Sequence, residues 1–312
     1  MTALTPAEGS GFAVVICTYT EQRRDLLLAA LASVQAQTLP PDEIVVVADG
    51  NERLFARLQA IVDGARVIRN PGPPGLSGAR NAGVAATTAP LVAFLDDDAV
   101  AEPTWLERLA AAYAADARII GVGGAVAPRW LGQPPSWLPA EFLWTIGCSY
   151  RGLPTASCPV RNVIGANMSF RRWAILAVGG FNHAIGQIGP SMQRGDDTEL
   201  CIRLTQRLPR ATILYEPSAL IRHAVPPERT TMQYFLRRCY TEGLAKAHLA
   251  RLVGAQSALA EERRYALVTV PRAIVRELVS GRAEGVQRAA AIGLGLVVTA
   301  LGYLQGRIEH LI

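Results

Sequence analysis

The sequence predicts an α/β fold, with a mostly parallel sheet flanked by helices and a helical extension at the carboxyl end of the chain. Apolar runs at residues 12–18, 44–48 and 91–95 are short and continuous, as in strands buried on both faces of a parallel sheet. Helix-forming segments lie between them, which the parallel crossover requires. The second and third runs lead into aspartates, at the edge where open α/β sheets bind ligands.

Composition limits the class of protein. The 312 residues are half apolar, enough for one large α/β domain with an extension. The net charge of +5 comes from arginine with a single lysine, Lys246, and suits phosphorylated substrates or anionic lipid. No basic run with interleaved aromatic residues indicates a nucleic-acid partner. The five cysteines are widely spaced and the amino end lacks a signal-peptide pattern, so we expect a cytoplasmic protein.

The elements follow in order along the chain. A strand at residues 12–18 precedes a helix in which Leu27, Leu31 and Val34 recur at helical spacing. The second strand, at residues 44–48, ends at Asp49 and a turn. The next predicted elements are a short third strand at 67–70, a Gly/Pro-rich loop at 71–78, a helix from 79, the strand at 91–95, and a helix after Pro103.

Two acidic clusters carry the predicted chemistry. Asp96, Asp97 and Asp98 follow a buried strand, and adjacent carboxylates repel one another unless they are solvated or hold a cation such as Mg²⁺ or Mn²⁺. A solvated acidic turn is the alternative. Asp196 and Asp197 precede a helical pattern, where either residue suits a helix cap. Three acids among residues 196–199 exceed what one cap requires, so the cluster indicates a second acidic site.

The order of these parts resembles the family 2 glycosyltransferases, enzymes of the Rossmann-like GT-A fold. The resemblance covers roughly residues 12–240, and its motifs lie at residues 16–19, 47–50, 78–83 and 94–98. It implies that Asp49 contacts the nucleotide base. It also implies that Asp96 and Asp98 bind the donor diphosphate through a divalent cation. Ala48 stands where many relatives have a further Asp, so the base contact depends on Asp49 alone.

The resemblance also implies that Asp197 is the catalytic base, with Asp196 in place of the family's Glu. His223 is then the third metal ligand, whereas a single histidine in an unrelated protein is usually structural. Trp137 offers a ring for a sugar face, or else packs a long loop. The candidate substrate-binding residues are Thr18, Tyr19, Asp49, Arg80, Asp96, Asp97, Trp137, Asn167, Arg229 and Arg238, the last two as diphosphate contacts or as solvated surface.

The predicted activity is that of an inverting glycosyltransferase. A sugar moves from a nucleotide-sugar donor, expected to be a UDP-sugar, to a hydroxyl of a lipid-linked or cell-envelope glycan precursor. A haloacid-dehalogenase-type phosphatase is an alternative, because residues 96–100 fit its Asp-x-Asp-x-Val nucleophile motif. That class needs a lysine between its acidic motifs, and Lys246 follows both. A catalytically inactive nucleotide-sugar-binding module is a third hypothesis, which the two intact acidic clusters disfavour.

Two domains are expected: a catalytic domain at residues 1–228 and a helical extension at 229–312. Residues 289–304 are uncharged, and as a helix they would be about 24 Å long, short of the ~30 Å hydrocarbon core. Arg272 and Arg276 lie among apolar neighbours in a pattern that suits an anionic membrane surface. We therefore expect a peripheral protein on the inner face of the cell membrane. A buried core helix is the alternative.

Overall fold

The computed structural model describes residues 11–50, 52–185 and 195–308. The chain forms two compact units. The first contains Met1–Ala127, Pro154–Met192 and Asp196–His223, and the second contains Pro128–Leu153, Gln193–Gly195 and Ala224–Ile312. The second unit therefore includes residues 128–153, which the predicted boundary at residue 228 assigns to the catalytic domain.

The first unit is built on a mixed sheet, which has nine strands within the described residues. Its order is β3-β2-β1-β4-β8-β6-β9-β5, with β7 paired to β9. The four adjacent strands β3, β2, β1 and β4 are parallel, as predicted. However, β8 pairs antiparallel with β4 and with β6, so the sheet as a whole is not mostly parallel. The strands are β1 Phe12–Thr18, β2 Glu43–Ala48, β3 Arg66–Arg69, β4 Leu91–Asp96, β5 Ala99–Ala101, β6 Ile119–Trp130, β7 Cys158–Pro159, β8 Asn167–Arg171 and β9 Thr212–Val225.

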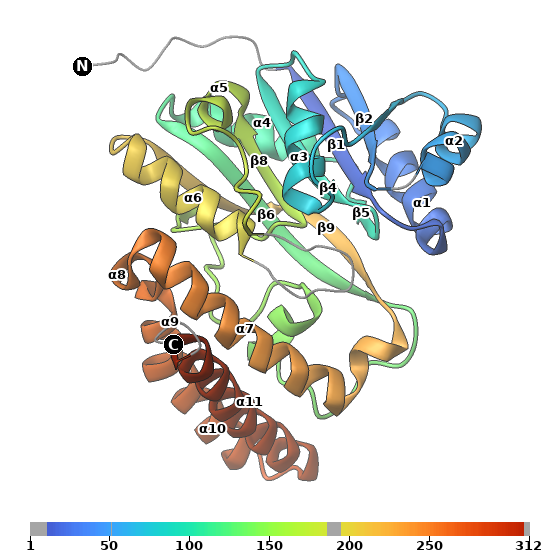
Figure 1. Cartoon of the computed structure of the whole chain (residues 1–312). Helices are drawn as coiled ribbons and strands as arrows, with labels where there is room; N and C mark the ends of the chain where they lie inside the picture. Colours follow the sequence, from blue (N-terminus) through green and yellow to red (C-terminus); the bar gives the residue numbers. More distant parts are fainter. Residues whose placement is uncertain (1–10, 51, 186–194, 309–312) are drawn as a thin grey trace. The chain divides into compact units, whose positions relative to one another are not determined.

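Helices flank this sheet. They are α1 Arg24–Gln35, α2 Glu52–Ile61, α3 Leu76–Ala85, α4 Trp105–Ala115, α5 Arg172–Ala177 and α6 Asp196–Arg207. Figure 1 shows α3 in front of the parallel strands. Gly83 permits this close approach, because a Cβ atom there would lie 2.4 Å from Val15 Cγ1. The α3 helix begins at Leu76, before the predicted residue 79, because Gly75 at φ 132° already turns the chain into the helix.

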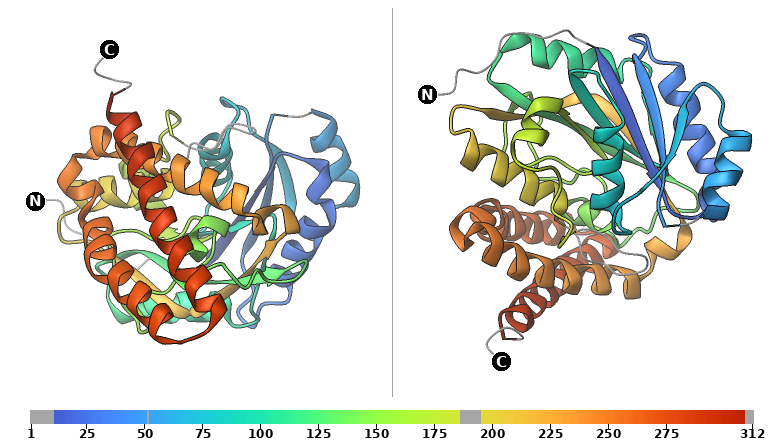
Figure 2. Two further views of the ribbon diagram at one scale, coloured as in Figure 1. Left: turned by 90° about the horizontal axis from the view of Figure 1, so that it is seen from below. Right: turned by 45° about the horizontal axis from the view of Figure 1, so that its top comes forward.

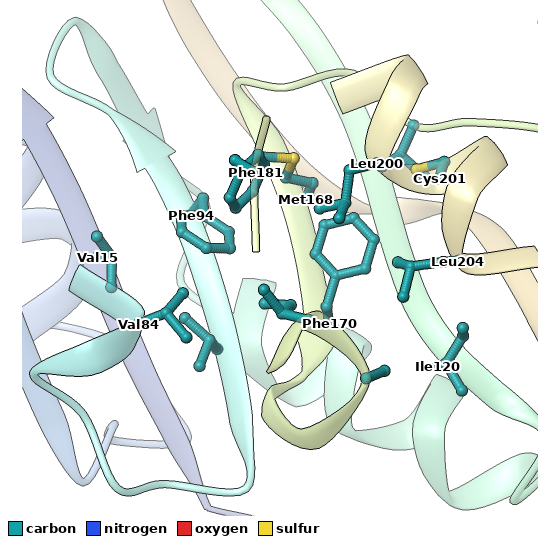
Figure 3. Packing of buried hydrophobic residues seen from close by; sticks show 14 of the residues in the cluster. Val15, Val84, Phe94, Ile120, Met168, Phe170, Phe181, Leu200, Cys201 and Leu204 are labelled. Atoms are coloured by element: carbon teal, nitrogen blue, oxygen red, sulfur yellow. The ribbon is translucent and has the colours of Figure 1, made fainter. Parts of the chain in front are cut away.

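The core of the first unit lies between the sheet and α3, α5 and α6. Phe94 on β4 meets Phe181 edge-on, with 5.3 Å between ring centroids. Figure 3 shows Phe170 and Met168 of β8 facing Leu200 and Leu204 of α6. Burying these side chains stabilises the fold by about 1.5–3 kcal/mol each. The packing fixes the start of α6, which carries the second acidic cluster.

The second unit is helical. Its helices are α7 Met232–Val253, α8 Ala255–Ala258, α9 Ala260–Arg264, α10 Val270–Val279 and α11 Ala283–Ile308, with a 3₁₀ turn at Ala140–Ile146. In both views of Figure 2 the helices coloured orange to red lie against one another. Their core is centred on Phe142, Phe235 and Ile292. Trp137 packs edge-on against Phe235, with 5.5 Å between centroids, as its packing interpretation predicted.

The two faces of α11 differ. One face carries glycines and packs on α7, since a Cβ atom at Gly302 would lie 2.1 Å from the carbonyl oxygen of Tyr240. Among the helices of the described residues, α11 is long and apolar enough to cross a membrane by length and composition. The buried core helix that we gave as the alternative describes only the glycine face, which packs on α7. The opposite face is exposed and apolar, with Leu294, Val297, Leu301, Leu304 and Ile308 spaced three or four residues apart.

Candidate active site

The first acidic cluster lies where β4 ends. Asp97 and Asp98 form the turn into β5, which pairs antiparallel with β9 so that Ala99 stands opposite His223. This register brings His223 Nε2 to 3.0 Å from Asp98 Oδ1. One ligand atom from each of Asp96, Asp98 and His223 lies within 4.8 Å of the other two. His223 lies inside β9, and the structure brings the three predicted metal ligands together.

The chemistry of this cluster fits a divalent cation. Two carboxylates and an imidazole are ligands that Mn²⁺ accepts, and carboxylates also suit Mg²⁺. A separation of 3.0 Å suits a hydrogen bond and also two ligands that share a cation. Within the described residues, His223 Nδ1 and Asp97 Oδ2 are buried without a hydrogen-bond partner. Buried polar atoms of this kind are costly unless a ligand or water satisfies them.

Arg23, which the sequence analysis did not select, balances the charge of the buried carboxylates. It ends a 3₁₀ turn after β1, and its Nη1 atom lies 2.8 Å from Asp97 Oδ1 and 3.3 Å from Asp98 Oδ2. Burial raises the pKa of the Asp97 carboxyl to about 6, and the adjacent Asp98 adds to this rise while Arg23 opposes it. The pKa of Arg23 is raised by the two carboxylates despite its own partial burial.

Arg80 links the two acidic clusters. Its guanidinium group forms an ion pair with Asp196, lies 3.6 Å from Asp96 Oδ1, and donates to the carbonyl oxygen of Gly165 at 3.0 Å. The side chain is buried and its guanidinium lies over the Phe181 ring. Burial alone would lower the pKa of Arg80, but the surrounding acids, Asp196 first, raise it. Its contacts are with protein groups, whereas the sequence predicted a substrate contact.

Asp197 is the more exposed member of the second acidic pair. Its Oδ2 atom accepts a hydrogen bond from Gly165 N at 2.8 Å, and Oδ1 accepts one from Thr198 N at 2.6 Å. These bonds orient the carboxylate at the start of α6, where the helix dipole favours negative charge. Asp196 is buried and bound to Arg80, so Asp197 is the acid that remains nearer to solvent.

Asp49 organises the loop before α3. Asp49 Oδ1 accepts from Asn70 Nδ2 at 2.7 Å and Oδ2 accepts from Gly75 N at 2.8 Å. Both carboxylate oxygens therefore accept hydrogen bonds from protein groups, and the contact of Asp49 with the nucleotide base stays a prediction. The sequence reasoning missed Asn70 as a partner of Asp49. Thr18 is buried at the end of β1, and Tyr19 is exposed beside Arg23.

Two predicted substrate contacts are placed in interior positions. Asn167 is 0% exposed: Oδ1 accepts from Trp105 Nε1, and Nδ2 donates to the carbonyl oxygens of Ala125 and Ala219. Arg238 is buried in the second unit and donates to Thr145 O at 3.2 Å. Asn167 therefore joins strands and a helix and has no exposed atom to offer a substrate. Arg229 is half-buried in the 3₁₀ turn Pro227–Thr230, and its diphosphate contact stays a prediction.

The fold and the acidic site are those of a glycosyltransferase. Residues 13–178 match the family model described as glycosyl transferase family 2, and the chain belongs to this family. This excludes the haloacid-dehalogenase alternative.

Known relatives agree with this assignment. The chain is 35% identical to a glucosyl-dolichyl phosphate glucuronosyltransferase of Haloferax volcanii, over 75% of each chain. It is 28% identical to the succinoglycan biosynthesis protein ExoM of Rhizobium meliloti, over 78% of this chain and 76% of that protein. The solved mannosyltransferase PcManGT from Pyrobaculum calidifontis, in complex with GDP-Man and Mn²⁺, has a TM-score of 0.57 at 17% identity, covering 94% of this chain and 86% of that one. This likeness shows the GT-A fold.

Proposed function

We propose that the protein is an inverting, cation-dependent glycosyltransferase that moves a sugar from a nucleotide-sugar donor to a hydroxyl of a lipid-linked acceptor. A UDP-sugar is the first donor to test. The observation that carries this proposal is the position of Arg80 between the two acidic clusters, 3.6 Å from Asp96 and paired with Asp196. Arg80 thereby contacts Asp96 of the candidate cation site and Asp196, the neighbour of the candidate base Asp197.

Asp96, Asp98 and His223 would hold the cation, either Mg²⁺ or Mn²⁺. A bound divalent cation supplies positive charge that stabilises a leaving nucleoside diphosphate. Asp197 accepts the proton of the acceptor hydroxyl while that oxygen forms its bond to the anomeric carbon. The bond from this carbon to the diphosphate oxygen breaks on the opposite face, and its electron pair leaves with the nucleoside diphosphate. One in-line displacement inverts the anomeric configuration and needs no covalent intermediate.

The lipid-linked acceptor is supported by a relative and by the second unit. The Haloferax volcanii protein is named for a glucosyl-dolichyl phosphate acceptor, and ExoM for succinoglycan biosynthesis. The second unit combines the exposed apolar face of α11 with exposed arginines, among them Arg264, Arg272 and Arg282. Basic and apolar groups together suit an anionic membrane surface. No disulfide joins cysteines within the described residues, which supports a cytoplasmic location on the inner face of the membrane.

The test is transfer by the purified full chain. UDP- and GDP-sugars would be offered with Mn²⁺, Mg²⁺ or EDTA and with lipid-phosphate-linked monosaccharides in detergent. We expect cation-dependent transfer from one donor class, with the product showing the opposite anomeric configuration to the donor by NMR. A product that retains the configuration would contradict the single-displacement mechanism, and full activity in EDTA would contradict the cation site.

A further inference from the structure

Two arginines form ion pairs with different aspartates of the run Asp96–Asp97–Asp98. Arg80 lies 3.6 Å from Asp96, while Arg23 lies 2.8 Å from Asp97 and 3.3 Å from Asp98. Arg80 is also paired with Asp196, so it serves both clusters. Among the residues that the structure describes, Arg23 forms its ion pairs with Asp97 and Asp98, which lie in one turn. Its effects on this turn can therefore be tested with little disturbance of the α6 cluster.

Arg23 holds one side of a carboxylate whose other side faces His223. Asp98 Oδ2 lies against Arg23 Nη1, and Asp98 Oδ1 lies 3.0 Å from His223 Nε2. The plane of this carboxylate is thus fixed from two directions. The Asp97 carboxylate is fixed by the same nitrogen atom of Arg23. Neighbours that orient metal ligands in this way typically change metal affinity 10- to 100-fold when they are removed.

The placement of Arg23 favours such a function over a general effect on folding. Its side chain is 25% exposed, whereas those of Asp97 and Asp98 are 4% and 5% exposed, so the arginine closes the turn from the solvent side. The guanidinium also lies over the exposed Tyr19 ring at 5.5 Å, which restricts it further. Arg23 belongs to the short 3₁₀ turn Glu21–Arg23, and no residue of this turn is buried in the core.

We propose that Arg23 is a positioning residue of the cation site, which bridges the Asp97 and Asp98 carboxylates and aligns Asp98 with His223 before the cation binds. The inference depends on the proposed function, since it assumes that Asp98 and His223 bind the cation. Arg23 acts through these side chains and need not touch the reacting atoms.

The direction in which Mn²⁺ affinity changes when Arg23 is removed distinguishes a positioning residue from a simple charge effect. By Coulomb's law alone, removal of a positive group beside a cation site strengthens cation binding. Removal of a group that orients the ligands weakens binding, because the cation must then order them itself. The two explanations therefore predict opposite shifts in the same measurement.

The experiment compares Arg23→Ala, Arg23→Gln and Arg23→Lys in the full chain. Arg24→Ala is the matched control, because Arg24 is the next residue, has the same charge and is exposed. Mn²⁺ binding would be measured by electron paramagnetic resonance with and without UDP, and folding by circular dichroism. We expect Arg23→Ala to weaken Mn²⁺ binding about 10- to 100-fold. Arg23→Lys should recover part of the affinity, and Arg24→Ala should match the unmodified protein.

Mn²⁺ affinity that is unchanged or tighter in folded Arg23→Ala would overturn the proposal. If that variant does not fold, Arg23→Gln gives the same comparison, since its NH₂ group keeps two N–H donors without the charge. A purely structural residue would reduce the fraction of folded protein without moving the Mn²⁺ half-saturation point of the remainder. Asp98→Ala separates the two levels of inference: normal Mn²⁺ binding by that variant would contradict the proposed cation site itself.

Discussion

Arg80 and Asp196 form a buried ion pair at the start of α6 although 116 positions separate them in the chain. The pair joins α3 to α6. Because Arg80 also reaches Asp96 and the carbonyl oxygen of Gly165, the end of β4 and the loop before β8 meet at the same guanidinium group.

Breaking this pair should destabilise the protein. Arg80→Met leaves Asp196 buried without its counter-charge, which typically costs about 3–5 kcal/mol. Arg80→Met combined with Asp196→Leu should recover a large part of this loss. The measurement is the free energy of unfolding in urea. Arg118→Ala, at the exposed pair with Asp116, is the control and should leave the transition midpoint unchanged. Equal losses in the single and double variants would contradict the interpretation.

Substitution of the candidate base should separate binding from chemistry. Asp197→Asn keeps the shape of the side chain but removes its capacity to accept a proton. We expect donor affinity to survive and transfer to fall by about 10²–10⁴, the usual contribution of acid–base catalysis. Steady-state transfer and UDP binding by calorimetry measure the two effects. An inactive Asp196→Asn beside a nearly normal Asp197→Asn would show that Asp196 is the base.

His223→Ala should weaken the cation site while the fold remains intact. His223 is on β9 and its Nε2 atom faces Asp98, so its removal takes one of the three clustered ligand atoms. Mn²⁺-dependent UDP binding should weaken about 10-fold or more. The thermal midpoint of the cation-free protein reports on folding. A large drop in that midpoint, with normal Mn²⁺ dependence of the folded fraction, would make His223 a core residue instead.

Glu43 should make a pH-dependent contribution to stability. Partial burial favours its neutral form, but hydrogen bonds from Thr88 and from Ala89 N outweigh this and lower the pKa of Glu43. A carboxyl with a lower pKa in the folded state binds protons more weakly there than in the unfolded chain. Its contribution is therefore present above the unfolded pKa of about 4.3 and is lost as the pH falls through the folded value.

Glu43→Gln tests this contribution by urea unfolding from pH 7 to pH 3. We expect a loss of about 1 kcal/mol at pH 7, because the side chain is only partly buried. The difference from the unmodified protein should shrink towards pH 3. A difference that stays constant over this range would show that the carboxylate charge does not contribute.

The outer face of α11 should bind anionic vesicles. Val297→Glu with Leu301→Glu places two charges on this face, so flotation of the full chain with phosphatidylglycerol liposomes should fall to the level seen without liposomes. Gln59→Glu with Gln133→Glu adds the same charge at exposed polar positions outside α11 and is the matched control. Equal flotation of both double variants would exclude this face. A mass by light scattering that halves only in the first variant would make the face an interface between two copies of the chain.

The parallel half of the sheet could be predicted because its signals are local. Residues 12–18 and 91–95 are continuous apolar runs, and helices with their own periodicity, α1 and α4, come after them along the chain. In the antiparallel half, β5 has three residues and β7 has two, so these two strands are too short for any periodic pattern. The α2 helix was missed although Leu54 and Leu58 stand one turn apart.

The residues of the candidate site also differ in whether a local sequence pattern marks them. Asp96, Asp98 and Asp197 could be selected because each lies in a short motif. Arg23 could not, since its contact with Asp97 spans 74 positions and no local pattern marks it. Asn167 shows the opposite case: the family resemblance suggested a substrate contact, and the amide instead bonds to three chain segments in the interior.

The pairing of Ala99 with His223 has a consequence for how this enzyme tolerates insertions and deletions. Side chains alternate across a strand, so a slip of one residue in β9 would turn His223 to the opposite face of the sheet and bring Arg222 or Ala224 to its place. A shift of two residues keeps the face but presents Ile221 or Val225, neither of which ligates a cation. An insertion or deletion before His223 is therefore harmless only if the loop before β9 accommodates it and the pairing of Ala99 with His223 is kept. The alignment of β5 with β9 thus decides whether the imidazole reaches Asp98.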